Sequence, residues 1–150
     1  MIAIDTNILV YARRAEAPHH VAAKALLTGL AEGTRPWALF WPCVYEFLRV
    51  VTHPRVFDPP TALGDAVDDI ASLLASPSVV SVGEGPSHLS HLERMLDDDG
   101  LCGNLVHDAH IAALAVEHGV SEFLTADRDF TRFTKVRCRN PFARPGAAKR

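Results

Sequence analysis

The chain has 150 residues, of which 48% are apolar, and a formal net charge of −3. This length fits one domain with a single hydrophobic core. Uninterrupted apolar runs stay well below the roughly 18 residues that cross a bilayer, and no basic-then-apolar signal pattern opens the chain. We therefore expect a cytoplasmic protein without a membrane segment.

Short apolar segments alternate along the chain with segments whose apolar residues repeat at helical spacing. We expect strands at residues 2–4, 37–40, 79–82, 122–125 and 135–138. We expect helices at 8–14, 42–51, 63–74 and 105–118, and a helix that Pro18 opens and Gly33 stops. A further helix is expected between the turn 83–86 and the acidic run 97–99, and a helical turn at 128–133. This alternation with short connections predicts an α/β fold with a mainly parallel sheet between helical layers.

Several residues at predicted boundaries have more than one interpretation. Asp5 follows the first strand, where it can cap the next helix or face the ligand crevice at the carboxyl end of a parallel sheet. Asn104 can cap the helix 105–118, and Gly119 is expected to end that helix in the left-handed conformation. Trp37 and Trp41 bracket the second strand, and we interpret them as core or dimer-interface residues rather than base-stacking platforms.

The C-terminal end is basic, whereas the rest of the chain is acidic. Residues 128–150 hold eight of the fifteen Lys and Arg residues and one acid, so they carry +7 and residues 1–127 carry −10. This asymmetry fits either nucleic-acid contact or a solubilising, flexible tail at 143–150. The three cysteines have no C-x-x-C spacing, which favours reduced thiols over disulfides or a zinc site.

Three further acids stand where the local pattern predicts apolar or turn positions. Glu46 shares a helical stripe with Cys43 and Phe47, and Asp108 lies in a helix rich in Ala, Leu and Ile. Asp127 follows the strand 122–125, as Asp5 follows the first strand, and Asp129 comes two residues later. Parallel strands gather their ligands at such ends.

A divalent cation would explain this set of acids. An ionised carboxylate that is buried without a partner costs several kcal/mol, and like charges raise that cost. Basic residues do not stand beside each acid in the sequence. An all-oxygen ligand set suits Mg²⁺ or Mn²⁺ better than zinc. The pairs His88/His91 and His107/His110 have the spacing of one helical face, but no third ligand is evident, so we do not interpret them as a metal site.

In this order and at these separations, the fragments resemble PIN-domain ribonucleases, and their layout is similar to the VapC toxins of bacterial toxin–antitoxin pairs. The resemblance rests on Asp5-Thr-Asn, Glu46 in Pro-x-x-x-Glu-Phe, Asp108-Ala-x-Ile-Ala-Ala and Thr125-Ala-Asp-Arg-Asp-Phe. It implies a PIN domain over residues 1–142 with a three-layer α/β/α fold. The basic end beyond Phe142 is not part of the family pattern.

The resemblance also implies an activity and a set of site residues. It implies a Mg²⁺- or Mn²⁺-dependent endoribonuclease whose catalytic and metal-binding acids are Asp5, Glu46, Asp108 and Asp127, and which leaves a 5′-phosphate and a 3′-hydroxyl. Supporting contacts are expected from Thr6, Asn7, Asn104, Thr125 and Asp129. An acidic pocket repels RNA unless cations surround it. The candidates for a phosphate-binding rim are Arg13, Arg14, Arg49, Arg128 and Arg132.

Two kinds of partner follow from the same resemblance. Such toxins form homodimers and are held by a small VapB-type antitoxin, whose C-terminal segment covers the groove and inserts a basic side chain among the acids.

An alternative function is that of a PIN-type RNA-binding or scaffold module without catalysis. A phosphatase of the haloacid dehalogenase type is disfavoured, since that family needs a second Asp two residues after the first and this chain has Asn7.

Overall fold

Five short parallel strands form the central sheet of the computed structural model, which describes residues 1–97 and 101–143. The strands are β1 (Ile2–Ile4), β2 (Trp37–Phe40), β3 (Val79–Val82), β4 (Glu122–Leu124) and β5 (Cys138–Arg139), in the spatial order β3-β2-β1-β4-β5. In the register, Ala3 of β1 stands between Ala38 of β2 and Phe123 of β4. From β1 the chain builds the sheet first on one side, through β2 and β3, and then on the other side, through β4 and β5. The direction of strand order therefore reverses at β1, and ligands of parallel sheets bind beyond the carboxyl ends of the strands at such a point.

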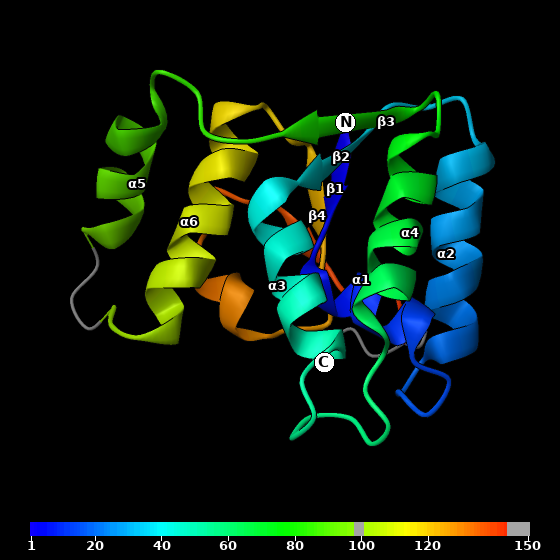
Figure 1. The fold of residues 1–150 in the computed structure, drawn as a ribbon. Coiled ribbons are helices and arrows are strands. Elements are labelled where there is room, and N and C mark those ends of the chain that lie inside the picture. Colours follow the sequence, from blue (N-terminus) through cyan, green and yellow to red (C-terminus); the bar gives the residue numbers. More distant parts are fainter. Residues whose placement is uncertain (98–100, 144–150) are drawn as a thin grey trace.

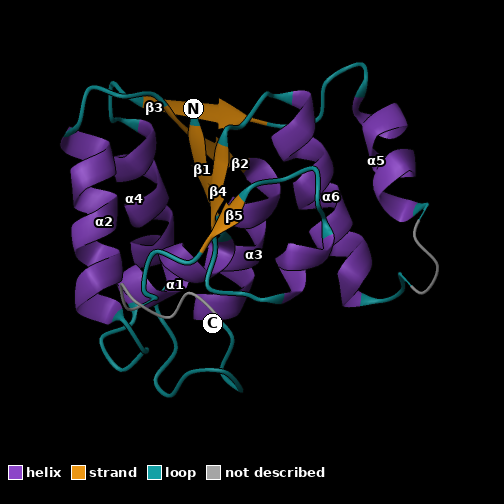
Figure 2. Ribbon diagram, turned by 180° about the vertical axis from the view of Figure 1, so that it is seen from behind, coloured by secondary structure: helices purple, strands orange, loops and turns teal. Residues whose placement is uncertain are grey.

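Helices cover both faces of this sheet, and Figures 1 and 2 show it between them. They are α1 (Thr6–Arg13), α2 (His20–Glu32), α3 (Trp41–Val51), α4 (Leu63–Leu74), α5 (His88–Leu96) and α6 (Asn104–Glu117), with a 3₁₀ turn, η1, at Asp129–Arg132. The expected α/β/α fold is confirmed. Within the described residues, no helix combines the length and apolar character needed to span a membrane.

Alternate residues of the strands enter two separate cores. Ala3 and Phe123 point to the face where α5 and α6 pack, and Phe40 joins them. Ile4 and Leu124 point to the opposite face, where α1, α2, α3 and α4 contribute the other apolar side chains. The strand β2 is buried along its whole length, as expected for an inner strand covered on both faces.

Most predicted elements are present, but several boundaries differ. Helix α1 begins at Thr6 rather than residue 8, because the Asp5 carboxylate caps it. Gly103, and not Asn104, occupies the N-cap of α6, so the predicted Asn104 cap is wrong. Strand β5 lies at Cys138–Arg139 rather than 135–138. Gly119 has the expected positive φ of 62°. Residues 98–100 of the predicted acidic helix end and residues 144–150 of the predicted tail lie outside the described residues.

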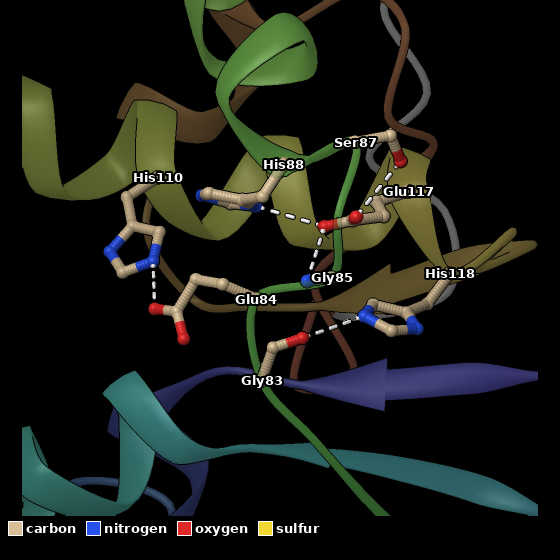
Figure 3. A network of polar contacts seen from close by, with 8 residues as sticks. All are labelled: Gly83, Glu84, Gly85, Ser87, His88, His110, Glu117 and His118. Carbon is tan, nitrogen blue, oxygen red and sulfur yellow. Dashed lines mark hydrogen bonds and ion pairs between the residues drawn. The ribbon is translucent and has the colours of Figure 1, made fainter.

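The segment between β3 and α5 is tied to the end of α6 by one buried carboxylate (Figure 3). Glu117, whose side chain is 6% exposed, accepts hydrogen bonds from His88 Nδ1 at 3.0 Å, Ser87 Oγ at 2.9 Å and the Gly85 amide at 3.3 Å. Burial raises the pKa of this carboxyl, but the three hydrogen bonds together lower it below its usual value. Next to it, His118 Nε2 donates to the Gly83 carbonyl at 2.8 Å.

Removal of this carboxylate is expected to destabilise the fold. Glu117→Ala leaves three donors without their acceptor, and we expect the free energy of unfolding to fall by about 2–3 kcal/mol. Urea denaturation measures the loss, with Glu93→Ala on the exposed face of α5 as the matched control. Equal stability of the two variants would show that the contacts of Glu117 contribute little.

Candidate active site

Asp5 is held at the end of β1 by three donors. Its Oδ1 accepts from the Thr6 amide at 2.7 Å, and its Oδ2 accepts from Thr125 Oγ1 and Asn7 Nδ2, each at 2.6 Å. The residue is 7% exposed. Burial is the main cause that raises the pKa of Asp5 to about 7; the hydrogen bonds from Thr125 and Thr6 oppose this rise, and the charges of Glu46 and Asp127 add to it. Asp5 is therefore both a helix cap and a carboxylate at the sheet edge.

Glu46 reaches the same place from α3. Its Oε2 accepts from Thr6 Oγ1 at 2.8 Å and from His107 Nε2 at 3.2 Å, and its Oε1 lies 3.5 Å from Arg49. The hydrogen bond from His107 is the largest cause that lowers the pKa of Glu46. The same contact is the largest cause that raises the pKa of His107. Glu46 thus stays ionised beside the buried Asp5.

The remaining acids approach from α6 and from the turn after β4. Burial raises the pKa of Asp108, followed by the charge of Asp127, with Glu46 and Asp129 adding to the rise. The Asp127 amide donates to Thr125 Oγ1 at 2.9 Å, and Asp127 Oδ1 accepts from the Asp129 amide at 2.8 Å. These contacts fix the turn that brings Asp127 back towards the end of β1.

The four predicted acids line common space. A cavity of about 260 Å³ is bordered by Asp5, Glu46, Asp108 and Asp127, with Thr6 and Asn7 between them. A wider hollow of about 940 Å³ shares Glu46, Asp108 and Asp127, and extends along α3 and α6. Asp129 and Asn104 line the wider hollow only. The structure therefore brings together carboxylates that lie up to 122 positions apart in the sequence.

The five arginines predicted for the rim occupy different surroundings. Arg49 lines the wider hollow beside Glu46. Arg128 and Arg132 are exposed at the ends of the turn that follows Asp127. The side chain of Arg13 instead pairs with Asp69 at 3.2 Å and Asp65 at 3.4 Å on α4.

Arg14 is also engaged away from the carboxylates. It pairs with Glu16, donates to Thr61 Oγ1 at 3.0 Å and lies over the Phe57 ring, 4.3 Å from its centroid. Neither Arg13 nor Arg14 lines the two hollows that contain the acids. Their contacts give both residues a structural role.

The sequence-based prediction gave His107 no part in the acidic site and considered it only as half of the His107/His110 pair. Its ring nevertheless reaches Glu46 on the neighbouring helix. One turn along α6, His110 Nε2 donates to Glu84 Oε1 at 2.8 Å (Figure 3). Adjacency to Asp108 was the only sequence signal for His107, because its partner comes from a segment 61 residues away.

The chemistry of the donor set fits a hard divalent cation. Four carboxylates surround the small cavity, and two of them, Asp5 and Asp108, have a raised pKa partly through the charge of neighbouring acids. Among residues 1–97 and 101–143, no three His, Cys, Asp or Glu side chains already converge as a finished metal shell. The residues that would hold such a cation are Asp5, Glu46, Asp108 and Asp127.

Known proteins are similar to this chain in sequence and in fold. The family model of the PIN domain matches residues 2–136. Ribonuclease VapC43 of Mycobacterium tuberculosis is 38% identical over 141 residues, which cover 94% of this chain and 95% of that protein. Ribonuclease VapC48 of the same organism is 37% identical over 139 residues, or 93% and 96% of the two chains. The fold also matches a crystal structure of VapBC2 from Rickettsia felis bound to a DNA fragment from their promoter, with a TM-score of 0.67 and 19% identity over 93% of this chain and 98% of that one.

Proposed function

The chain belongs to the PIN-domain family, within its VapC group, and from this premise we propose that it is a metal-dependent endoribonuclease that acts as the toxin of a toxin–antitoxin pair. The observation that carries this proposal is the meeting of Asp5, Glu46, Asp108 and Asp127 around one small cavity. The names of relatives with 37–38% identity, which describe ribonucleases, support the same activity.

In this proposal, the four carboxylates hold Mg²⁺ or Mn²⁺. When bound, the ion lowers the pKa of a coordinated water and offsets the charge that develops on the phosphodiester. The chain's own polar residues fix the carboxylates that hold it. Thr125 and Asn7 orient Asp5, and Thr6 bridges Asp5 and Glu46 through its amide and its hydroxyl.

His107 has a positioning part in the same scheme. Its hydrogen bond to Glu46 Oε2 keeps that side chain turned to the hollow. Asp129 donates its amide to Asp127, so it orients the turn rather than entering the small cavity. Asn104, at the first turn of α6 and on the wall of the wider hollow, is available to contact substrate.

RNA approaches this acidic hollow past cations at its margin. Arg49 borders the hollow itself, and Arg128 and Arg132 flank the turn that carries Asp127. We assign these three residues to phosphate contact. Arg13 is left to its ion pairs with α4, and Arg14 to its ion pair with Glu16 in the turn after α1. A homodimer and a VapB-type antitoxin complete the proposed assembly, and the match to the VapBC2 structure supports the partner.

Digestion of total RNA by the purified, antitoxin-free protein tests the proposal. We expect discrete fragments with Mg²⁺ or Mn²⁺, 5′-phosphate and 3′-hydroxyl ends at the cuts, and no cleavage in EDTA. Addition of the antitoxin should stop the reaction. A folded protein that binds RNA but cuts it with neither metal would instead be the non-catalytic RNA-binding module.

A further inference from the structure

A strip of aromatic and cationic side chains runs along the exposed face of α3, beside the carboxylates. Trp41, Tyr45 and Arg49 are spaced four residues apart, so they lie on one face of the helix. Trp41 is 37% exposed and Tyr45 66% exposed, and the Arg49 side chain is 68% exposed. Cys43 and Phe47, on the opposite face of the helix, are buried.

The two tryptophans, which received the same interpretation from the sequence, differ in exposure in the structure. Trp37 is fully buried in the core, as predicted. The Trp41 indole instead lies beside the Tyr45 ring, with their centroids 5.9 Å apart and their planes at 38°. Both rings line the 940 Å³ hollow together with Glu46, Asp108 and Asp127. An exposed aromatic pair is therefore continuous with the proposed site of cleavage.

The charge of this hollow limits what can attract a nucleic acid to it. Its described lining includes five carboxylates, those of Glu46, Glu84, Asp108, Asp127 and Asp129, but Arg49 is the only Lys or Arg. Attraction of phosphates is correspondingly weak here. Stacking of bases on aromatic rings needs no positive charge, since every base has a π-face.

From this juxtaposition we propose that Trp41 and Tyr45 are a base-stacking subsite for unpaired nucleotides of the RNA substrate, with Arg49 on the adjoining phosphate. The inference rests on the proposed ribonuclease function and adds a base-binding subsite to it. Only bases outside a duplex can offer their faces to side chains, so the subsite selects single-stranded segments and loops over paired RNA.

A contact between two copies of the chain is the competing use of these rings. Trp, Tyr and Arg are common in protein interfaces, but Asp and Glu are depleted there. The surroundings favour RNA, because Trp41 and Tyr45 line a hollow that also contains five carboxylates. Aromatic rings next to a cation and a catalytic site are typical of surfaces that hold single-stranded nucleic acid.

Tryptophan fluorescence offers a direct test. Because Trp37 is buried, quenching on addition of RNA reports on Trp41. The intact chain is titrated in EDTA with a short single-stranded oligoribonucleotide and with the same sequence as a duplex. We expect quenching and tighter binding for the single strand. Because Trp41→Ala removes the reporting indole, the Kd of each variant is measured by fluorescence anisotropy of a dye-labelled form of the same single strand. Trp41→Ala and Tyr45→Ala should each raise this Kd about tenfold, the change that corresponds to a stack of about 1.4 kcal/mol.

Control variants separate stacking from other effects. Trp41→Phe keeps a ring and should recover most of the affinity, whereas Val21→Ala, which trims a side chain that is 80% exposed on α2, should leave it unchanged. In Mg²⁺, the two alanine variants should raise KM more than they lower kcat. Light scattering must show the same oligomeric state for the variants as for the unchanged chain.

The outcomes distinguish this inference from the proposed function. If the unchanged chain cleaves RNA while both alanine variants keep its Kd and KM, the subsite is refuted and the ribonuclease remains. If the alanine variants lose affinity only because the assembly dissociates, the rings belong to an interface between copies. If the unchanged chain neither binds nor cleaves RNA, both proposals fail.

Discussion

Asp108→Asn is expected to lower kcat for RNA cleavage about a thousandfold, and also to make the metal-free protein more stable. The loss follows because Asp108 is one of the four carboxylates proposed to hold the ion that activates water. The gain follows because burial and the charge of Asp127 raise the pKa of Asp108, so its ionised form is disfavoured in the folded chain. The amide removes that repulsion and keeps the shape of the side chain.

Cleavage rates in Mg²⁺ and thermal unfolding in EDTA measure the two effects on the same preparation. Asp68→Asn is the matched control, since Asp68 is exposed on α4 and lines neither acidic hollow. We expect the control to keep the activity and to leave the Tm unchanged, and Asp108→Asn to raise the Tm by a few degrees. Retained activity of Asp108→Asn would remove this residue from the catalytic set.

Without metal, the stability of the protein is expected to fall as pH rises from about 4 to about 7. The pKa of Asp5 is raised from 3.8 to about 7 by burial, so the folded state binds a proton that the unfolded state releases within this window. The stability that protonated Asp5 contributes is therefore fully present below pH 4 and is lost as pH approaches 7. The loss is at most about 4 kcal/mol, since a tenfold change in proton affinity is worth about 1.4 kcal/mol.

Other groups shape the same pH profile. The raised pKa of His107 adds stability that is likewise lost as pH rises. The lowered pKa values of Glu46 and Glu117 act in the opposite sense, and their contribution is lost as pH falls through the acid range. The loss of stability between about pH 5 and pH 7 therefore belongs mainly to Asp5, with the raised pKa of Asp108 acting in the same sense. The contribution of His107 is lost only as pH rises above its ordinary pKa of 6.5.

Urea denaturation between about pH 5 and pH 8 measures this profile in EDTA and in Mg²⁺. We expect Mg²⁺ to flatten it, because a bound cation favours ionised carboxylates and so compensates for the deprotonation of Asp5. Asp5→Asn should flatten it without metal. A metal-free stability that is level across this range would contradict the proposed state of Asp5.

The sequence predicted the buried inner strand β2 more accurately than the edge strand β5. The apolar run at Trp37–Phe40 is recognisable because a strand covered on both faces needs no alternation. The last strand was placed three residues too early. Val136 instead continues the preceding turn, with its amide bonded to the Phe133 carbonyl, and pairing with β4 uses the carbonyls of Arg137 and Arg139.

The candidate site could be assembled from sequence because each acid breaks a local pattern. Glu46 and Asp108 interrupt apolar helical faces, and Asp5 and Asp127 follow strands. Contacts between distant segments left no such signal. The hydrogen bond from His107 to Glu46 and the pairing of Arg13 with Asp69 depend on how helices pack, which the spacing along one helix cannot reveal.

The exposure of Trp41 also depends on packing. Both tryptophans adjoin the second strand in the sequence, but Trp37 begins β2 and Trp41 begins α3. The chain turns at that point, so one indole enters the core and the other reaches the surface. A sequence pattern that predicts the elements correctly therefore still leaves their outward-facing side chains to be found from the structure.

The central claim is that the four carboxylates form a metal site. Titration calorimetry of Mn²⁺ binding to the purified chain tests it most directly, near pH 7 and in two buffers of different ionisation enthalpy. We predict a saturable Mn²⁺ site that is lost in Asp108→Asn and kept in Asp68→Asn, with proton release on binding as Asp5 ionises. Failure to bind Mn²⁺, or equal binding by Asp108→Asn, would contradict the assignment of these four carboxylates to a metal site.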